Sequence, residues 1–291
     1  MAPINVTSVE QQGSTPIQSS QAAPIVRFEQ VTIEFGDDPA LIDLSFALYA
    51  GDTTVIMGTA GSGKTVLLKT TIGLIRPDAG HVYLFGQDIT KLNENELLGL
   101  RRRAGVLFQE SAIFDSLTVE ENVSYPLVNP PDQRRPESEV QSRVKEALDF
   151  VNLGGTAVRY PSELSGGMRR RVGIARALVG DPKIVMFDEP TAGLDPPTAR
   201  TICELAMKLR DLEDVSSIFV THEMNNLEYI CSEYAVVDED GKVIFEREGE
   251  RLCLINSKVM MMREGKVIFS GTDEALRRAE DPYIKRFLRG H

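Results

Sequence analysis

The chain contains the stretch Gly58-Thr59-Ala60-Gly61-Ser62-Gly63-Lys64-Thr65, which matches the pattern G-x-x-x-x-G-K-[ST]. An apolar run over residues 53–57 precedes it, and a helical pattern over about residues 64–75 follows it. Glycines let backbone N–H groups converge on phosphate oxygens, and the start of a helix adds positive potential. The order of strand, loop and helix therefore predicts a phosphate-binding loop. In it, Lys64 would reach the β- and γ-phosphates and the Thr65 hydroxyl would bind Mg²⁺.

A second apolar run ends in two acidic residues. Residues 184–187 are apolar, and Asp188 and Glu189 follow directly. Paired acids after a strand are often only a solvated loop. Beside a phosphate loop, however, an acid at a strand end completes the Mg²⁺ site. We expect Asp188 to hold the metal and Glu189 to act as general base on the attacking water.

The remaining pattern alternates strands with helices. Buried-strand runs cover residues 183–187 and 216–220, and a helix of about 196–212 lies between them, which favours a parallel α/β sheet. Residues 31–35 and 44–49 are predicted to form strands near the N-terminus. A helix with apolar residues from Val140 to Val151 indicates a helical insertion over about residues 109–165.

Composition excludes several classes of protein. The 291 residues hold 43 acidic and 32 basic side chains, a net charge of −11, which disfavours a dedicated nucleic-acid binder. No apolar run is long enough for a membrane-spanning helix, and no secretory signal is visible at the N-terminus. The widely spaced Cys203, Cys231 and Cys253 indicate neither a zinc site nor a disulfide framework, so we expect reduced thiols.

The two ends of the chain differ from its middle. Residues 1–24 carry a single charge and no apolar period, so we expect a disordered tail. The sequence DGKVIF at 240–245 recurs as EGKVIF at 264–269, and each copy predicts a β-hairpin with a glycine turn. Residues 228–250 hold eight acidic and two basic side chains, an acidic patch around the first copy.

Further motifs follow in an order that resembles the ABC-type ATPases. Gln109, in the sequence VLFQ, resembles the Q-loop, and residues 164–168, LSGGM, resemble the signature usually written LSGGQ. Asp195, in AGLD, resembles the D-loop, and His222, in VTHE, resembles the switch histidine. Phe35 resembles the aromatic residue that stacks on adenine. The chain is therefore identified as a member of that family.

The resemblance implies a fold and a set of partners. The fold would be a P-loop NTPase of ABC type, with a mixed sheet, an antiparallel β part, a RecA-like core and an inserted α-helical subdomain. The cofactors would be ATP and Mg²⁺. Two subunits would pack head to tail as a homodimer, so that the phosphate loop of one faces Ser165, Gly166 and Gly167 of the other across ATP. Hydrolysis would let the dimer open and convert binding energy into motion.

The resemblance also assigns roles to residues. Glu189 and His222 would be catalytic, Asp195 would belong to the D-loop, and Thr65, Gln109 and Asp188 would surround the metal. The nucleotide would be bound by Phe35, Gly58, Thr59, Ala60, Gly61, Ser62, Gly63, Lys64 and Thr65.

The signature itself departs from the family pattern at one position. Met168 stands where the family usually has Gln and lacks the side-chain amide, although the backbone donors remain. The neighbouring residues 169–171 are all arginine and would form a solvated face or help to neutralise phosphate.

Three features resemble one subfamily of the ABC-type ATPases. Met168, the segment 121–127 (ENVSYPL) and the ending 287–290 (FLRG) are similar to the ATPase of the Mla lipid-asymmetry system and its Mce-associated relatives. That similarity implies a multi-span permease, an Mce-domain lipid-binding protein and a small regulatory subunit as partners. It also implies phospholipid or another hydrophobic cargo, and a peripheral place on the cytoplasmic face of the inner membrane.

Two other functions compete with lipid transport. One is import of a small solute by the same kind of ATPase, and the other is a non-transport ABC ATPase acting in DNA repair or translation. The expected organisation is a tail over 1–24, an ABC ATPase domain over 25–275 with an extra acidic hairpin at about 231–256, and a helical extension over 276–291. Its basic helices are expected to dock on a protein partner rather than on a membrane surface.

Overall fold

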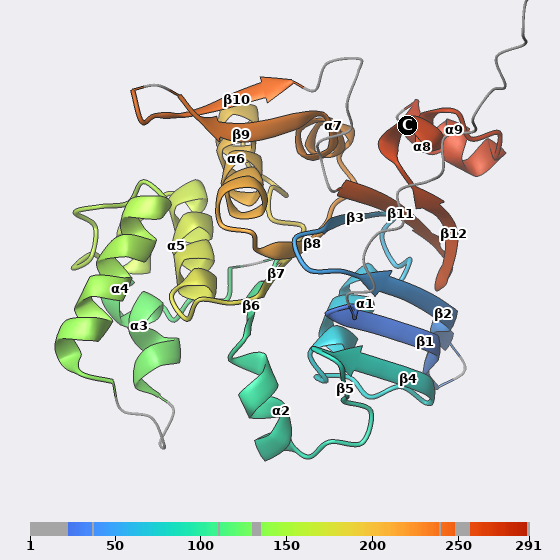
Figure 1. The fold of residues 1–291 in the computed structure, drawn as a ribbon, viewed down its shortest axis with the longest axis horizontal. Helices are drawn as coiled ribbons and strands as arrows, with labels where there is room; N and C mark the ends of the chain where they lie inside the picture. The colour runs from blue at the N-terminus through green and yellow to red at the C-terminus, as the bar shows by residue number, and fades with distance from the viewer. Residues whose placement is uncertain are drawn as a thin grey trace, which may run out of the picture.

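The central sheet has six strands, five of them parallel. The computed structural model describes residues 23–36, 38–109, 111–129, 135–238, 240–247 and 257–289, and its fold is drawn in Figure 1. The strands run in the order β12-β11-β3-β8-β7-β6, and only β12 is antiparallel to its neighbour. Their bounds are β12 Lys266–Gly271, β11 Ser257–Arg263, β3 Thr53–Met57, β8 Ser216–Val220, β7 Ile184–Asp188 and β6 Ala104–Leu107.

The apolar runs in the sequence become the middle of this sheet. Every residue of β3, β7 and β8 is buried, as expected of parallel strands that are covered on both faces. Alternate side chains enter two separate cores. Ile56 and Met186 face one core, whereas Val55 and Phe187 face the other. The predicted mixed α/β sheet is confirmed.

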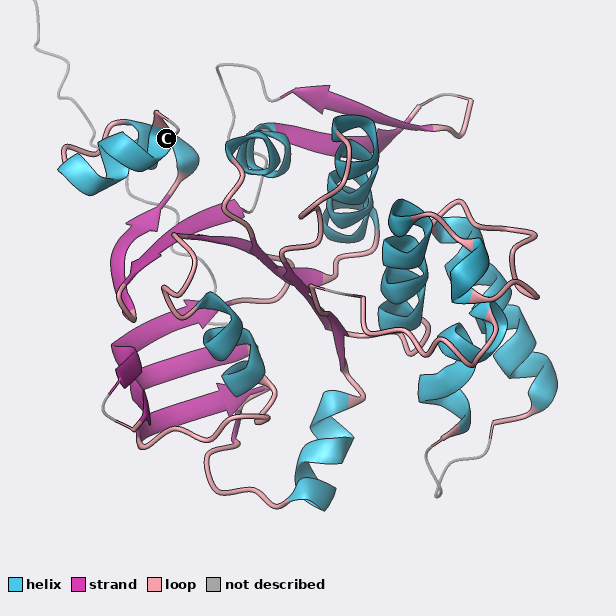
Figure 2. Cartoon of the chain, turned by 180° about the vertical axis from the view of Figure 1, so that it is seen from behind, coloured by secondary structure: helices cyan, strands magenta, loops and turns pink. Residues whose placement is uncertain are grey.

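One core lies under a second, antiparallel sheet, seen beside helix α1 in Figure 2. This sheet has the order β2-β1-β4-β5, with β1 Val26–Phe35, β2 Asp38–Leu48, β4 Ala79–Leu84 and β5 Gln87–Asp88. Its strands alternate buried and exposed residues, which is why the sequence showed a period of two. Helix α1, Lys64–Thr71, fills the space between the two sheets.

Helix α1 ends earlier than the predicted residue 75. Gly73 adopts a left-handed conformation (φ 69°), its N–H bonds to the Thr70 carbonyl, and the Leu74 N–H bonds to the Lys69 carbonyl. This is a glycine-terminated helix end, in which reversed backbone bonds close the last turn. The predicted C-terminal boundary was therefore wrong by about one turn.

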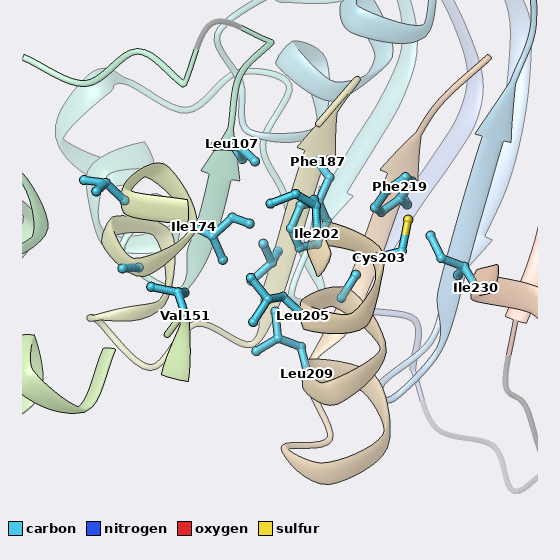
Figure 3. Packing of buried hydrophobic residues seen from close by; sticks show 14 of the residues in the cluster. Leu107, Val151, Ile174, Phe187, Ile202, Cys203, Leu205, Leu209, Phe219 and Ile230 are labelled. Carbon is cyan, nitrogen blue, oxygen red and sulfur yellow. The ribbon is translucent and has the colours of Figure 1, made fainter. Parts of the chain in front are cut away.

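The other core joins helices α5, Gly166–Leu178, and α6, Pro196–Leu212, to the central sheet. Figure 3 shows Ile174, Ile202 and Leu205 from these helices meeting Phe187 and Phe219 from the strands. Helices α3, Val119–Val128, and α4, Glu137–Phe150, pack on α5 as a helical group of their own, joined to α5 through the short 3-10 helix η1, Pro161–Glu163.

Helix α3 was not predicted, because Pro126 and the prolines after it break the helical pattern. It begins at a capping box, in which the Thr118 side chain accepts from the Glu121 N–H and Glu121 caps the Thr118 N–H. Pro126 lies near its end and cannot donate the N–H that a helix would bond to the carbonyl of residue 122, so the last turn of α3 is short of one backbone bond.

Both predicted hairpins are present, but they occupy different places. Strands β11 and β12 extend the central sheet, whereas β9, Glu233–Val237, and β10, Val243–Arg247, form a separate two-stranded sheet over α6. Gly241 (φ 78°) and Gly265 (φ 76°) make the two turns. Of the predicted acidic hairpin, residue 239 and residues 248–256, which include Cys253, lie outside the described residues, as does the predicted tail up to residue 22.

The remaining helices are short. They are α2 Glu94–Arg101, α7 Met224–Ser232, α8 Asp273–Arg277 and α9 Pro282–Leu288. Helix α9 lies within the expected C-terminal extension over 276–291, whereas α8 begins three residues before it. Within the described ranges, none of the helices has both the length and the apolar character needed to span a membrane. Cys203 is fully buried, and burial raises the pKa of its thiol to about 12, so this thiol is unreactive at neutral pH.

Candidate functional site

The phosphate loop is held in shape by glycines that have no room for a side chain. Gly63 is left-handed (φ 99°), and a Cβ added there would lie 2.5 Å from the Ala40 carbonyl oxygen. A Cβ on Gly58 would lie 2.4 Å from the Met262 carbonyl oxygen, at the end of β11. The N–H of Gly265, in the turn after β11, donates to the Ser62 carbonyl. The loop is thus wedged between the start of β2 and the β11–β12 turn.

Lys64 crosses the loop from the first turn of α1. It is 7 % exposed, and its Nζ donates to the carbonyl oxygens of Gly58 (2.8 Å) and Thr59 (2.9 Å). Its Nζ also lies 3.8 Å from Glu189 Oε1. Burial lowers the pKa of the ammonium group, while Glu189 and Asp188 oppose that shift. A bound phosphate would supply the counter-charge that this buried ammonium needs.

A phosphate group fits the donors that the loop leaves open. Ser62 Oγ is buried and has no hydrogen-bond partner, an unusual condition for a hydroxyl among the described residues. A Cβ on Gly61 would meet nothing within 4 Å, so the loop is open on that side. An orphaned hydroxyl beside an open loop and a buried ammonium fits an anionic ligand.

Thr65 and Asp188 together suit Mg²⁺. The Thr65 hydroxyl donates to Asp188 Oδ1 at 3.1 Å, which joins the start of α1 to the end of β7. Asp188 is nearly inaccessible, and burial raises the pKa of its carboxyl group. A hydroxyl and a carboxylate are hard oxygen ligands, and Mg²⁺ at phosphate sites takes few protein ligands beside phosphate oxygens and water. The donor set therefore fits this metal.

Glu189 and His222 meet at the same edge of the sheet. His222 Nδ1 lies 2.8 Å from Glu189 Oε2. The two residues follow β7 and β8, which are neighbouring parallel strands, so their ends meet at one edge of the sheet. Glu189 has a left-handed backbone (φ 48°), an uncommon conformation for a residue with a side chain. Its N–H donates to the Val220 carbonyl, which ties the two strand ends together. This pair could hold and orient a water molecule for attack on a phosphorus atom.

Of two further predicted residues, Gln109 lies near this edge, and Phe35 lies on the antiparallel sheet. Gln109 follows β6, which pairs with β7 in parallel so that Leu107 is opposite Phe187; the chain therefore leaves the sheet beside Asp188. Phe35 ends β1 and is 55 % exposed, so its ring is available to a ligand.

The signature segment is not brought to the phosphate loop within one chain. Ser165 caps α5, where its side chain accepts from the Met168 N–H at 3.2 Å, and Gly166 and Gly167 form the first turn. Helix α5 packs against α3, α4, α6 and β6, whereas α1 packs against β2, β4, β7 and β8. The start of α5 is therefore not part of the wall of the phosphate loop in the same chain.

Asp195 begins helix α6 beside that segment. Its carboxylate accepts from the Thr198 N–H (3.1 Å) and hydroxyl (2.8 Å), and these bonds lower the pKa of Asp195. A Cβ on Gly167 would lie 2.3 Å from Thr198 Cγ2, so α5 and α6 touch at their starts. Arg170 adds a bond from α5 to the Ala192 carbonyl at 3.0 Å.

Sequence patterns did not reveal three contacts around the site. Arg176 donates to the Ser111 and Ala112 carbonyls in the loop after Gln109. Tyr283 of α9 places its hydroxyl 3.4 Å from Thr59 Oγ1. Asn226 of α7 lies beneath the loops of Glu189 and His222. These residues follow no motif spacing, and only the packing of distant elements brings them to the site.

Comparisons with known proteins agree with this geometry. The family model described as ABC transporter matches residues 41–192. A similar curated protein is the "Probable ribonucleotide transport ATP-binding protein mkl" of Mycobacterium tuberculosis (strain CDC 1551 / Oshkosh), 34% identical over 278 residues, 94% of this chain and 70% of that protein. The "Methionine import ATP-binding protein MetN" of Carboxydothermus hydrogenoformans is 40% identical over 207 residues, 71% of this chain and 60% of that one.

Solved structures extend the likeness to the fold. An ATP-binding cassette solved as a dimer in a post-hydrolysis state, bound to ADP and Pi, has a TM-score of 0.70 and 29% identity, over 85% of this chain and 98% of that one. A nucleotide-free cassette from an ABC transporter has a TM-score of 0.73 and 26% identity, over 92% and 100%. Family model, relatives and fold agree: the chain belongs to the ABC transporter family as its ATP-binding subunit, an ABC ATPase that binds and hydrolyses ATP.

Proposed function

We propose that two copies of this chain form a head-to-tail dimer with two ATP molecules between them. The observation that carries this proposal is the separation of the two halves of the site. Lys64 lies at the start of α1, whereas the capped start of α5, with Gly166 and Gly167, packs elsewhere in the same chain. A helix start that carries two glycines suits the γ-phosphate of an ATP bound by the partner, because its backbone N–H groups point along the helix axis.

Each site would divide its work among the residues described above. Residues 58–65 cradle the phosphates, and Phe35 stacks on adenine. Thr65, Asp188 and Gln109 surround Mg²⁺, which neutralises charge on the phosphates when bound. Glu189 takes a proton from the attacking water, and His222 holds that carboxylate in place. Ser165, Gly166, Gly167 and Met168 bind the partner's ATP, and Asp195 supports this contact from α6.

The cargo would reach a separate membrane permease, which docks beside the Q-loop. Phe114 and Tyr125 stack there with ring centroids 4.7 Å apart, and they are 40% and 38% exposed. Val128 extends this apolar patch along α3. Arg176 holds the loop between Gln109 and this patch by donating to the Ser111 and Ala112 carbonyls. Movement of the patch would therefore be transmitted to Gln109.

The cargo class is proposed to be phospholipid or another hydrophobic molecule, moved across the cell envelope with an Mce-domain partner. Met168, the segment 121–127 and the ending 287–290 support this class by their resemblance to the Mla and Mce systems. The subunit would then work at the cytoplasmic face of the inner membrane. A second candidate is import of a small solute, which the relative named for methionine import favours.

Reconstitution separates these candidates. The multi-span membrane protein that co-purifies with the chain is identified and co-expressed with it, and the complex is placed in proteoliposomes. Extraction of labelled phospholipid that depends on ATP supports the lipid function, and accumulation of labelled methionine supports the small-solute function. If the chain instead retains nucleic acid at physiological salt and binds no membrane protein, both transport proposals are wrong.

A further inference from the structure

Asn226 connects the two loops that carry Glu189 and His222. It lies on α7, is 1% exposed, and its amide nitrogen donates to Thr191 Oγ1 (2.7 Å) and Thr221 Oγ1 (3.0 Å). Thr191 comes two residues after Glu189, and Thr221 comes directly before His222. Both threonines are buried, so neither bond competes with water.

The direction of these bonds is fixed by the surrounding groups. The same nitrogen lies 3.3 Å from Glu223 Oε2, and a carboxylate can only accept at neutral pH. On its other side, Asn226 Oδ1 accepts from the Cys203 thiol at 3.4 Å. The Asn226 amide nitrogen must therefore point toward Thr191 and Thr221. An aspartate at position 226 would instead place a second carboxylate beside Glu223.

One backbone bond, from the Glu189 N–H to the Val220 carbonyl, already joins the ends of β7 and β8, and the Asn226 amide adds a side-chain link between the loops beyond it. Glu189 sits in a left-handed conformation, which persists only where the surroundings enforce it. His222 is more than half exposed and contacts Glu189 through a single nitrogen. Without the amide, the Thr191 and Thr221 hydroxyls would lose the donor that sets their separation.

We propose that Asn226 is a positioning residue for ATP hydrolysis, which sets the distance between Glu189 and His222 through Thr191 and Thr221. This inference rests on the proposed roles of Glu189 and His222. It predicts an effect on turnover and none on nucleotide affinity, because Asn226 touches no residue of the phosphate loop.

The test compares variants that remove the Asn226 amide or the Thr221 hydroxyl with a variant that keeps the Thr221 hydroxyl. Asn226→Leu keeps the volume and removes both donors, and Thr221→Val removes one acceptor. We expect Asn226→Leu to lower kcat by about 10- to 100-fold, since a small misplacement of catalytic groups costs this much. The KM for Mg-ATP should stay within about twofold of the wild type. Thr221→Ser keeps the hydroxyl and should restore most of the turnover that Thr221→Val loses.

A matched control lies at the other end of β8, the strand that leads to Thr221. The Thr53 and Ser217 hydroxyls form a buried pair, 2.9 Å apart, at the starts of β3 and β8. Thr53→Val removes the same kind of bond far from Glu189, so it should lower the melting temperature and leave kcat unchanged. The positioning role is wrong if Asn226→Leu and Thr221→Val keep wild-type kcat, or if Thr53→Val lowers kcat as much as Thr221→Val does. Where Asn226→Leu does not fold, the threonine variants decide.

The failure of this inference differs from the failure of the proposed function. If Glu189→Gln leaves turnover unchanged, the role of Glu189 is wrong and Asn226 has nothing to position. If Glu189→Gln stops turnover and the Asn226 and Thr221 variants do not reduce it, only the positioning role is wrong.

Discussion

Glu189→Gln tests the chemical step with little change in shape. The substitution exchanges one carboxylate oxygen for an amide, so side-chain volume and the contact with His222 can both persist. What is lost is the negative charge and the ability to accept a proton from water. The variant should therefore fold, bind Mg-ATP and dimerise, and fail at hydrolysis.

The expected loss of turnover follows from the role of a general base. Such a group contributes about 10²- to 10⁴-fold in rate, which is about 2.7–5.4 kcal/mol of barrier. The affinity for nucleotide, in contrast, should increase. Glu189 Oε1 lies 3.8 Å from Lys64 Nζ, and unit charges so close attract by about 4 kcal/mol at an effective dielectric constant of about 20. ATP must compete with part of that attraction, which the amide removes.

The assay measures steady-state phosphate release, the Kd for Mg-ATP and the mass of the complex with and without Mg-ATP. The wild type should turn over, and the variant should accumulate as an ATP-bound dimer. Glu264→Gln is a matched control, because Glu264 has the same left-handed backbone (φ 48°) and lies in an exposed turn. A kcat for Glu189→Gln within about twofold of the wild type would remove this residue from the role of base.

Three more substitutions probe other parts of the site. Lys64→Ala removes a buried ammonium and should weaken ATP binding by about 2–5 kcal/mol, measured by calorimetry; unaltered affinity would contradict the phosphate-loop assignment. Burial raises the pKa of the Asp188 carboxyl above its ordinary 3.8. Between that value and the pKa in the folded protein, the folded protein keeps a proton that the unfolded chain has lost. The free energy of unfolding therefore falls as the pH rises through this range. Asp188→Asn should therefore melt higher than the nucleotide-free wild type at neutral pH, with the difference shrinking toward about pH 4, and a lower melting temperature at neutral pH would refute this. Gly167→Ala places a Cβ 2.3 Å from Thr198 Cγ2 and should cost about 1–3 kcal/mol in stability and also lower kcat. Adding Thr198→Ser, which keeps the hydroxyl and removes the methyl group, should recover both.

The parts of the fold that depend on local chemistry could be predicted from the sequence. The runs that become β3, β7 and β8 are continuous apolar segments, because both faces of these strands are buried. The two glycine-turn hairpins were equally visible. Helix α3 was missed, since its start depends on one capping box and its sequence contains Pro126.

The candidate site was predictable only as far as motif chemistry reaches. Asp188 and Glu189 follow a buried strand, and Lys64 begins the helix after the glycine loop, so their neighbours in the sequence predict their roles. Asn226 could not be found in this way, because its partners Thr191 and Thr221 belong to two other loops. The roles assigned to Ser165–Met168 stay predictions, since a single chain does not contain the ATP that this segment would bind.

The place of β11 has a consequence for synthesis on the ribosome. The phosphate loop appears early, yet its outer wall is the Met262 carbonyl and the Gly265 turn, which emerge some two hundred residues later. Domains generally fold as units while the chain is being made. A nascent chain that stops before β11 would leave β3 as an open sheet edge and its phosphate loop without support. Nucleotide can thus stabilise the newly made subunit only once β11 and the turn after it have been made, because the phosphate loop lacks its outer wall until then.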